Sequence, residues 1–192
     1  EGMEFYGSVN LLKGGMVFAD YLTTVSPTYA KEILSKEFGC GLEGVLRNRQ
    51  DRLQGILNGI DVEAWNPATD PYLPANYSSG DLNGKQECKR ALQKEFELPQ
   101  ISVPLITVIA RLTYQKGIDL LESIAPQLMA MDLQLVILGT GEDHYEGLFR
   151  HLAWQYPGKM VVNICFDDVL ARRIYAAADL LLMPSLFEPC GI

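Results

Sequence analysis

The chain has 192 residues, 48% of them apolar, and its 24 acidic and 16 basic residues give a formal charge of −8. This size and composition indicate a soluble protein with one sizeable core, or one domain with part of another. The acidic excess disfavours nucleic acid as a partner, and no apolar run approaches the roughly 20 residues that span a bilayer. No export signal is visible, so we expect a cytoplasmic protein without a membrane partner.

The four cysteines, Cys40, Cys88, Cys165 and Cys190, are far apart in the sequence. They form no C-x-x-C pair and only two histidines accompany them, so neither a disulfide framework nor a zinc site is predicted. The chain begins at Glu1 without an initiator Met and stops at "EPCGI", directly after a predicted strand. We therefore expect a segment of a longer protein.

The first part of the chain shows little periodicity. "TTVSPTYAKEIL" predicts a short strand over residues 23–25 and a helix that Ser26 caps, with Pro27 in its first turn. A second strand is predicted over residues 53–57, before a turn at Asn58.

Residues 65–84 are rich in Pro, Asn, Asp, Ser and Gly, a composition that predicts a long surface loop. The charged segment "GKQECKRALQKEFEL" follows and predicts a helix that faces solvent. No internal repeat and no low-complexity tract interrupts this order.

The pattern becomes regular from residue 105. Apolar runs predict strands over residues 105–110, 133–138, 160–164 and 180–183, and amphipathic helical patterns separate them. Strands without polar alternation indicate a parallel sheet that is covered on both faces, so the predicted fold class is α/β with a Rossmann-like, doubly wound sheet. Pro126 is expected to kink or split the first helix, and an acidic cap is expected near Asp167 or Asp168 for the last one.

Ligands of doubly wound sheets bind where the carboxyl ends of strands meet helix N-termini, which attract anions. Arg111 follows the first of these strands, and Lys116 and Gly117 stand at the start of the next helix. A cation at a helix N-terminus is electrostatically unfavourable unless an anion binds there, so the pair indicates a phosphate or carboxylate site. The alternative is a surface Arg and Lys that merely frame a turn.

"GTGED" follows the second strand, and its glycines, Gly139 and Gly141, would let a ligand approach the backbone closely. The G-x-G-x-x-G fingerprint of dinucleotide-binding proteins is absent, because His144 stands where the third glycine belongs. A simple turn is the alternative.

Two further residues follow strands. Phe166 is placed to stack on a base, although a Phe at this position is more often part of a core. Glu188 stands in a loop where its carboxylate would accept hydrogen bonds from ligand hydroxyls, or cap a following helix. Cys190 is a small residue in the same loop, and no neighbouring base supports a role as nucleophile.

Together, "RLTYQKGIDL", "LVILGTGED", "ARRIYAAADLLLMPS" and "FEPCG" resemble the bacterial glycogen synthase and plant starch synthase family. "TTVSPTYAKEI" and "GILNGIDVEAWNPATD" extend the resemblance over nearly the whole chain. It implies a two-domain GT-B glycosyltransferase that moves glucose from ADP-glucose to the non-reducing end of an α-1,4-glucan, glycogen or starch. It also implies retention of configuration, no metal or other cofactor, and a cytoplasmic enzyme, or a plastid enzyme in a plant.

The resemblance divides the chain into residues 1–24, the end of the amino-terminal domain with the linker, and residues 25–192, a truncated carboxyl-terminal nucleotide-sugar-binding domain. It implies that Arg111 and Lys116 grip the donor diphosphate. Phe166 occupies the adenine-stacking position, which is usually Tyr in the family.

The remaining implied roles concern the nucleotide, the sugar and the cleft. Gly139 and Gly141 line the nucleotide site in this interpretation. Glu188 and the backbone of Cys190 and Gly191 hold the glucosyl hydroxyls, and Asn58 falls in the interdomain cleft.

Two positions depart from the family pattern, since Cys165 replaces a usual Gly and Leu186 stands where Arg is frequent. Most of the amino-terminal domain is missing, so we expect no synthase activity from this chain alone. The alternatives are a GT-B enzyme that uses UDP-glucose and a non-catalytic glucan-binding protein of the same fold.

Overall fold

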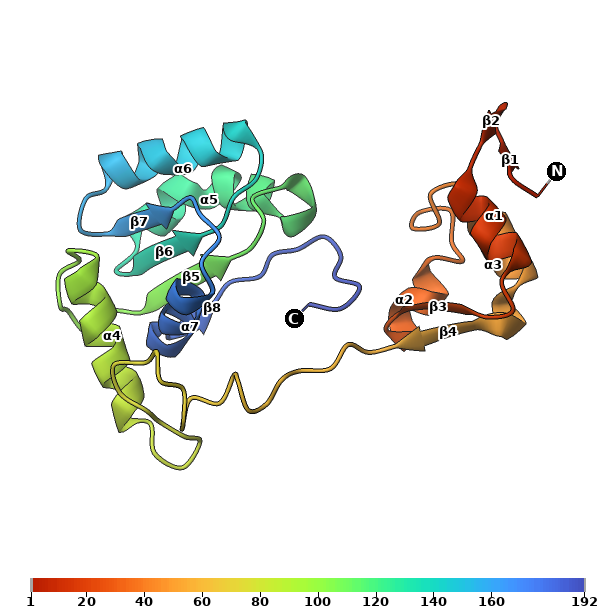
Figure 1. Ribbon diagram of the computed structural model, residues 1–192. Coiled ribbons are helices and arrows are strands. Elements are labelled where there is room, and N and C mark those ends of the chain that lie inside the picture. The colour runs from red at the N-terminus through yellow and green to blue at the C-terminus, as the bar shows by residue number, and fades with distance from the viewer. Residues whose placement is uncertain (1, 192) are drawn as a thin grey trace. The chain divides into compact units, whose positions relative to one another are not determined.

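The computed structural model describes residues 2–191 (Figure 1). Contacts divide the chain into a larger unit, Asp61–Phe187, and a smaller unit that contains the residues up to Ile60 and the segment from Glu188. The predicted boundary between residues 24 and 25 concerns the domains of a complete enzyme and stays a prediction. Across the described residues, no helix is both long enough and apolar enough to cross a membrane.

A four-stranded parallel sheet in the order β7-β6-β5-β8 forms the centre of the larger unit. All four predicted strands are confirmed, each slightly shorter than its apolar run: β5 (Leu105–Ile109), β6 (Gln134–Leu138), β7 (Met160–Asn163) and β8 (Leu180–Leu181). Every residue of β6 is buried, as expected for a strand that is paired on both sides.

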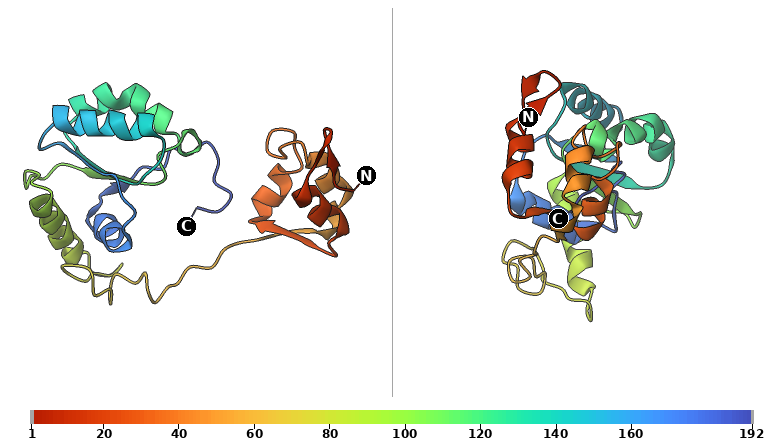
Figure 2. Two further views of the ribbon diagram at one scale, coloured as in Figure 1. Left: turned by 45° about the horizontal axis from the view of Figure 1, so that its top comes forward. Right: turned by 90° about the vertical axis from the view of Figure 1, so that its right-hand side faces the viewer.

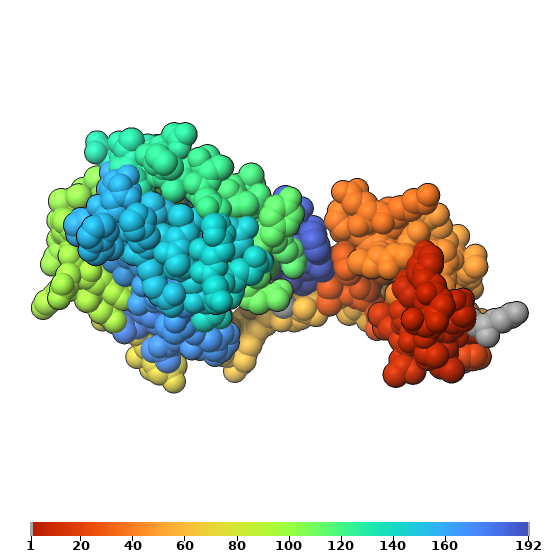
Figure 3. Space-filling model, turned by 90° about the horizontal axis from the view of Figure 1, so that it is seen from above, coloured from red at the N-terminus to blue at the C-terminus, as the bar shows by residue number. Residues whose placement is uncertain are grey.

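Helices cover both faces of this sheet (Figures 1 and 2). Alternate side chains of β6 enter two apolar clusters. Leu135 and Ile137 join the cluster of α5 (Ile118–Ala130) and α6 (Asp143–Gln155), whereas Val136 and Leu138 join that of α4 (Asn83–Glu95) and α7 (Asp168–Ala177). Figure 3 views the face that α5 and α6 cover. The doubly wound α/β prediction is confirmed, and its helices are α4 (Asn83–Glu95), the 3₁₀ turn η2 (Tyr114–Lys116), α5 (Ile118–Ala130), α6 (Asp143–Gln155) and α7 (Asp168–Ala177).

Helix α5 runs through Pro126 without interruption, so the proline does not split it, and the predicted alternative of a kink stays a prediction. Proline removes one backbone hydrogen bond, the one that its N–H would donate to the carbonyl four residues earlier. Leu121, Ala125 and Met129 are buried along one side of the helix and hold it against the sheet on both sides of this gap. Packing therefore outweighs the local preference.

Helix α4 was expected to face solvent, and this expectation is wrong for one of its faces. Cys88, Lys89, Leu92 and Gln93 are buried against the sheet. The Gln93 amide donates to the side-chain oxygen of Gln134 at 2.8 Å, and the Lys89 ammonium lies 2.5 Å from the Asp179 carboxylate. Because two of the four buried side chains are polar, the buried stripe is not visible as hydrophobic periodicity.

The smaller unit contains two separate two-stranded sheets and a core of Ile33, Leu42 and Leu46. The β1–β2 pair is antiparallel and the β3–β4 pair is parallel. Both predicted strands are confirmed, as is the cap, in which the Ser26 hydroxyl accepts from the Tyr29 N–H at 3.0 Å. The elements are β1 (Glu4–Phe5), β2 (Ser8–Val9), α1 (Leu11–Phe18), β3 (Leu22–Val25), α2 (Pro27–Glu32), α3 (Glu43–Asn48), η1 (Gln50–Arg52) and β4 (Leu53–Ile56).

The predicted surface loop over residues 65–84 contains no strand, and α4 begins at its end. Most of its residues are exposed, in agreement with the prediction, but Asp70 is only 5% exposed. A carboxylate is rarely buried without a partner, so at that point the loop must be attached to another segment of the larger unit.

Candidate functional site

Three loops meet at the carboxyl edge of the larger unit's sheet. They follow β5, β6 and β8 and comprise residues 110–117, 139–142 and 182–187, which we call the strand-end loops. Parallel strands bring these loops to one edge. The Leu112 N–H donates to the Thr140 carbonyl, and the Glu142 N–H donates to the Leu112 carbonyl, both at 2.9 Å. The first two loops therefore continue the sheet's hydrogen bonding beyond the strands.

Gly139 and Gly141 are required by this close packing. A Cβ atom on Gly139 would lie 1.8 Å from the Ala110 carbonyl oxygen, and one on Gly141 would lie 2.1 Å from the Leu112 carbonyl oxygen. Sequence reasoning expected the glycines to admit a ligand, whereas the atoms that approach them here belong to protein backbone. Their first role is to let two loops of the site pack against each other.

Gly117 joins the first loop to the third. Its φ of +68° is in the left-handed region, and an added Cβ would lie 2.1 Å from the Pro184 carbonyl oxygen. The Leu186 N–H donates to the Gln115 carbonyl at 2.9 Å, and the Gln115 amide donates to the Phe187 carbonyl at 3.4 Å. The turn that carries Lys116 is thus fastened to the loop after β8.

The two predicted cations, Arg111 and Lys116, lie in the first of these strand-end loops. Arg111 is exposed, and within residues 2–191 no ion pair to its guanidinium is found. Lys116 is half-buried and ends the 3₁₀ turn, one residue before the α5 cap at Gly117. No side chain caps α5, so its first N–H groups add positive potential at the same place, partly offset by Asp119 in the first turn.

Phe166 follows β7 and is 88% exposed, so the alternative that it is a core residue is wrong. The helix behind it is well anchored, because the Asp167 carboxylate accepts from the Leu170 N–H at 2.9 Å and caps α7. An exposed aromatic ring on a fixed strand end is available for stacking on a planar ligand.

Asn58, Glu188, Cys190 and Gly191 belong to the smaller unit. Asn58 and Gly191 are exposed, and Glu188 and Cys190 are half-buried. Their participation in one site with Arg111 and Lys116 stays a prediction.

Three buried polar atoms at or beside the strand ends were missed by sequence reasoning. They are the Thr113 hydroxyl, one carboxylate oxygen of Asp119 and the amide nitrogen of Asn163, none of which has a hydrogen-bond partner within the described chain. Buried polar atoms are nearly always satisfied, so these atoms are candidate ligand contacts. The only sequence signal was their position within a few residues of a strand end, or in the first turn of the following helix.

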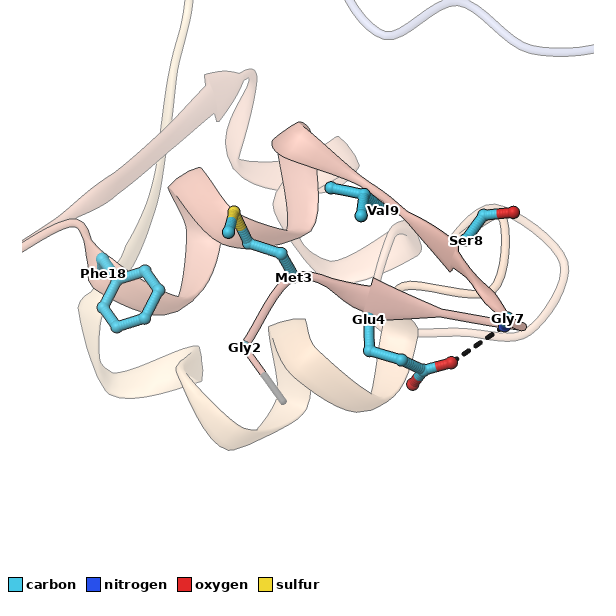
Figure 4. A pocket seen from close by; sticks show the side chains of 7 residues that line it. All are labelled: Gly2, Met3, Glu4, Gly7, Ser8, Val9 and Phe18. Atoms are coloured by element: carbon cyan, nitrogen blue, oxygen red, sulfur yellow. Dashed lines mark hydrogen bonds between the residues drawn. The ribbon is translucent and has the colours of Figure 1, made fainter.

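A cavity of about 510 Å³ lies in the smaller unit, lined by Gly2, Met3, Glu4, Gly7, Ser8, Val9 and Phe18 (Figure 4). Among the described residues of this lining the charged side chain is Glu4, which already accepts a hydrogen bond from the Gly7 N–H at 2.9 Å. The lining contains none of the predicted site residues, and the cavity offers no group of converging polar atoms. In the described chain, no cluster of three or more His, Cys, Asp or Glu side chains is arranged to hold a metal ion.

Two family models match the chain. Residues 1–48 match "Starch synthase catalytic domain" and residues 103–192 match "Glycosyl transferases group 1". Glycogen synthase of Anaeromyxobacter sp. (strain Fw109-5) is 56% identical over all of this chain, and glycogen synthase of Fervidobacterium nodosum is 52% identical. Over its whole length the chain is therefore similar to a segment of the glycogen synthases.

Solved structures give the same similarity. The catalytic domain of starch synthase IV from Arabidopsis thaliana, bound to ADP and acarbose, is 40% identical over 96% of this chain with a TM-score of 0.90. Sucrose-phosphate synthase from Thermosynechococcus elongatus, at 18% identity and a TM-score of 0.57, shares the fold alone. The chain spans 41% of the length of the first glycogen synthase, 40% of the second and 38% of the starch synthase chain.

Proposed function

We propose that this chain supplies the donor-binding part of an enzyme that transfers glucose from ADP-glucose to the non-reducing end of an α-1,4-glucan in the cytoplasm. The observation that carries the proposal is the pair Arg111 and Lys116, mounted on strand-end loops that backbone hydrogen bonds lock together. The glycogen synthase relatives and the starch synthase structure that contains ADP and acarbose support the choice of donor and acceptor.

Arg111 and Lys116 are suited to stabilise the leaving group of the reaction. When the bond between glucose and the diphosphate breaks, the leaving ADP gains negative charge, and preorganised positive groups stabilise that charge. Arg111, Lys116 and the uncapped N-terminus of α5 provide them from protein atoms. We propose that this set takes the place that a metal ion has in other transferases, and that no cofactor is needed.

The other residues have roles in holding the donor. Phe166 stacks on the adenine, for which its exposed ring is suited, and Gly139 and Gly141 keep the neighbouring loops close to the nucleotide. Glu188 and the backbone of Cys190 and Gly191 bind the glucosyl hydroxyls, and Asn58 lies in the cleft of the complete enzyme. Since no carboxylate is evident as nucleophile, we propose attack on the face from which the diphosphate leaves.

The direct test is substitution of each cation in the full-length protein. We expect Lys116→Ala and Arg111→Ala each to lower kcat/KM for ADP-glucose about 100-fold, roughly 3 kcal/mol of transition-state stabilisation, with little change in thermal unfolding. Lys94→Ala, at an exposed position near the end of α4, is the matched control. Unchanged turnover of ADP-glucose by Lys116→Ala would exclude the proposed role.

Titration calorimetry with ADP, UDP and GDP tests the donor separately from the reaction. We expect ADP to bind most tightly and Phe166→Ala to weaken it by about tenfold, the effect of losing one aromatic contact with a base. Tighter binding of UDP would favour the alternative enzyme that uses UDP-glucose. Glucan binding without any nucleotide binding would favour a non-catalytic protein.

A further inference from the structure

A small polar cavity lies between α4 and the segment that leads from α4 to β5. Its volume is about 210 Å³, and it is lined by four side chains of α4, Gln86, Lys89, Arg90 and Gln93, and by residues 100–102. Lys89 is 8% exposed and Gln93 is 2% exposed, so part of the lining consists of buried polar groups. Pockets for drug-sized ligands measure roughly 300–1,000 Å³, so this cavity suits a smaller molecule.

The buried side of the cavity is held in place by hydrogen bonds. The Gln93 amide nitrogen donates to the Ile101 carbonyl at 3.2 Å and to the side-chain oxygen of Gln134 at 2.8 Å. The Lys89 ammonium donates to the Val103 carbonyl at 2.6 Å. These bonds fix α4 and the following segment against each other, so the cavity between them is formed before any ligand binds.

The charged side chains of the lining are cations. Lys89 is paired with Asp179, whereas for the exposed Arg90 no ion pair or side-chain hydrogen bond is found within residues 2–191. The described residues of the lining include no carboxylate. The whole chain has a formal charge of −8, so this local excess of positive charge does not follow from its composition.

The same lining carries hydrogen-bond donors that the protein does not use. Among residues 2–191, no hydrogen bond is donated by the backbone N–H groups of Gln100 and Ser102. The Ser102 hydroxyl and the side-chain amides of Gln86 and Gln100 belong to exposed residues and have no partner in that part of the chain. A guanidinium with neighbouring N–H and O–H donors is a combination that binds phosphate oxygens.

The composition of the lining argues against other ligand classes. Its described residues include no aromatic ring on which a sugar or a base could stack, and no carboxylate, thiol or imidazole that could hold a metal ion. The small volume argues against a nucleotide. A small anion is therefore the ligand that this cavity fits.

The cavity lies away from the strand-end loops. Residues 100–102 precede β5 and Arg111 follows it, so the two places are at opposite edges of the parallel sheet. Figure 1 shows α4 and the segment before β5 at the end of the sheet where the strands start. A ligand in this cavity would not overlap with the proposed donor site.

We propose that this cavity binds a small oxyanion, either inorganic phosphate or the phosphate group of a small phosphomonoester. The Arg90 guanidinium and the Ser102 donors bind the phosphate oxygens, and the Lys89 ammonium adds positive charge from the buried side. The anion joins α4 to the segment that leads into β5. Because the cavity exists only in the folded protein, the anion stabilises the larger unit.

Titration calorimetry of the full-length protein with inorganic phosphate tests the site. The protein carries Arg111→Ala and Lys116→Ala, so that phosphate at the strand-end loops does not contribute. In this background we expect Arg90→Gln to weaken phosphate binding at least about tenfold, the effect of losing a charged hydrogen-bond donor. Lys94→Gln is the matched control, because it removes the same charge from an exposed position of α4 outside the lining, and its effect should stay below about twofold.

Thermal unfolding of the same variants gives a second readout and shows that each one is folded. Phosphate at about ten times its Kd should raise the melting temperature of the background protein by about 5 °C, and Arg90→Gln should remove most of this rise. Equal weakening by Arg90→Gln and Lys94→Gln would overturn the proposal, because phosphate would then respond only to the charge of the helix. Absence of phosphate binding by the background protein would overturn it as well.

A titration with glycerol 3-phosphate distinguishes the two sources of the anion. Binding of this ester at least as tight as that of inorganic phosphate would assign the site to phosphomonoesters, and weaker binding would assign it to the free ion. In either case Arg90→Gln must weaken the ligand that binds more tightly, and an unchanged affinity would overturn the proposal. None of these measurements involves ADP-glucose, so their outcome is independent of the proposed function.

Discussion

The two units of this chain differ in how much of their apolar surface they bury. The larger unit packs apolar clusters on both faces of a four-stranded parallel sheet. The smaller unit has a core of three buried residues, and helix α1 leaves Leu11 77% and Phe18 75% exposed. Parallel strands need cover on both faces, and only the larger unit provides that cover from its own elements.

This difference determines which parts of the candidate site are ordered by the chain itself. Arg111 and Lys116 lie on loops that backbone hydrogen bonds and close glycine contacts hold together at the end of the sheet. Asn58 lies in an exposed segment, residues 57–60, for which no hydrogen bond is found among residues 2–191. Precise placement of catalytic groups requires rigid support, and the strand-end loops of the larger unit give such support to Arg111 and Lys116.

The largest expected effect tests the contrast between the two cores. Phe149→Ala, at a position 1% exposed between α6 and the sheet, should lower the free energy of unfolding of the larger unit by about 4 kcal/mol. Leu46→Ala in the smaller core should lower that of its own unit by about 2 kcal/mol, because few neighbours line the space it leaves. Calorimetric unfolding of the full-length variants measures both, and equal losses would contradict the contrast.

A somewhat smaller effect tests the rigid frame. Gly139→Ala should cost about 3 kcal/mol, because its Cβ would lie 1.8 Å from a backbone oxygen that cannot move without breaking the loop contact. Gly147→Ala is the matched control, since a Cβ at this exposed position in α6 meets no atom within 4 Å. This control should stabilise the protein by up to about 1 kcal/mol through helix propensity. Denaturant titration compares them, and a tolerated Gly139→Ala would show that the loops can separate.

The smallest expected effect concerns alkaline pH. Burial raises the pKa of the Tyr175 phenol above its ordinary value of 10.0, so the folded larger unit favours the neutral form. Its contribution to stability is complete below pH 10 and is lost as the pH rises from there through the folded-state pKa. Tyr175→Phe should make the melting temperature less dependent on pH above about pH 10. An identical dependence in both proteins would exclude Tyr175 as a source of it.

Features that depend on residues close together in the sequence were predictable. The apolar runs set the four strands of the larger unit, and Ser26 and Asp167 cap helices where the cap rules place them. The spacing of Arg111 and Lys116 around a strand end also predicted a cationic turn at a helix start, and the structure has that turn.

Features that depend on contacts between residues far apart in the sequence were decided by the tertiary structure. Pro126 remains inside a helix because buried neighbours hold α5 on the sheet, and α4 buries Lys89 because Asp179, ninety residues later, neutralises it. Gly139 of "GTGED" packs against Ala110, and Arg172 of "ARRIY" forms an ion pair with Asp70. Neither partner is indicated by a local sequence pattern. Sequence periodicity reports which face of an element is apolar, whereas close packing and charge pairing depend on which distant segment meets that face.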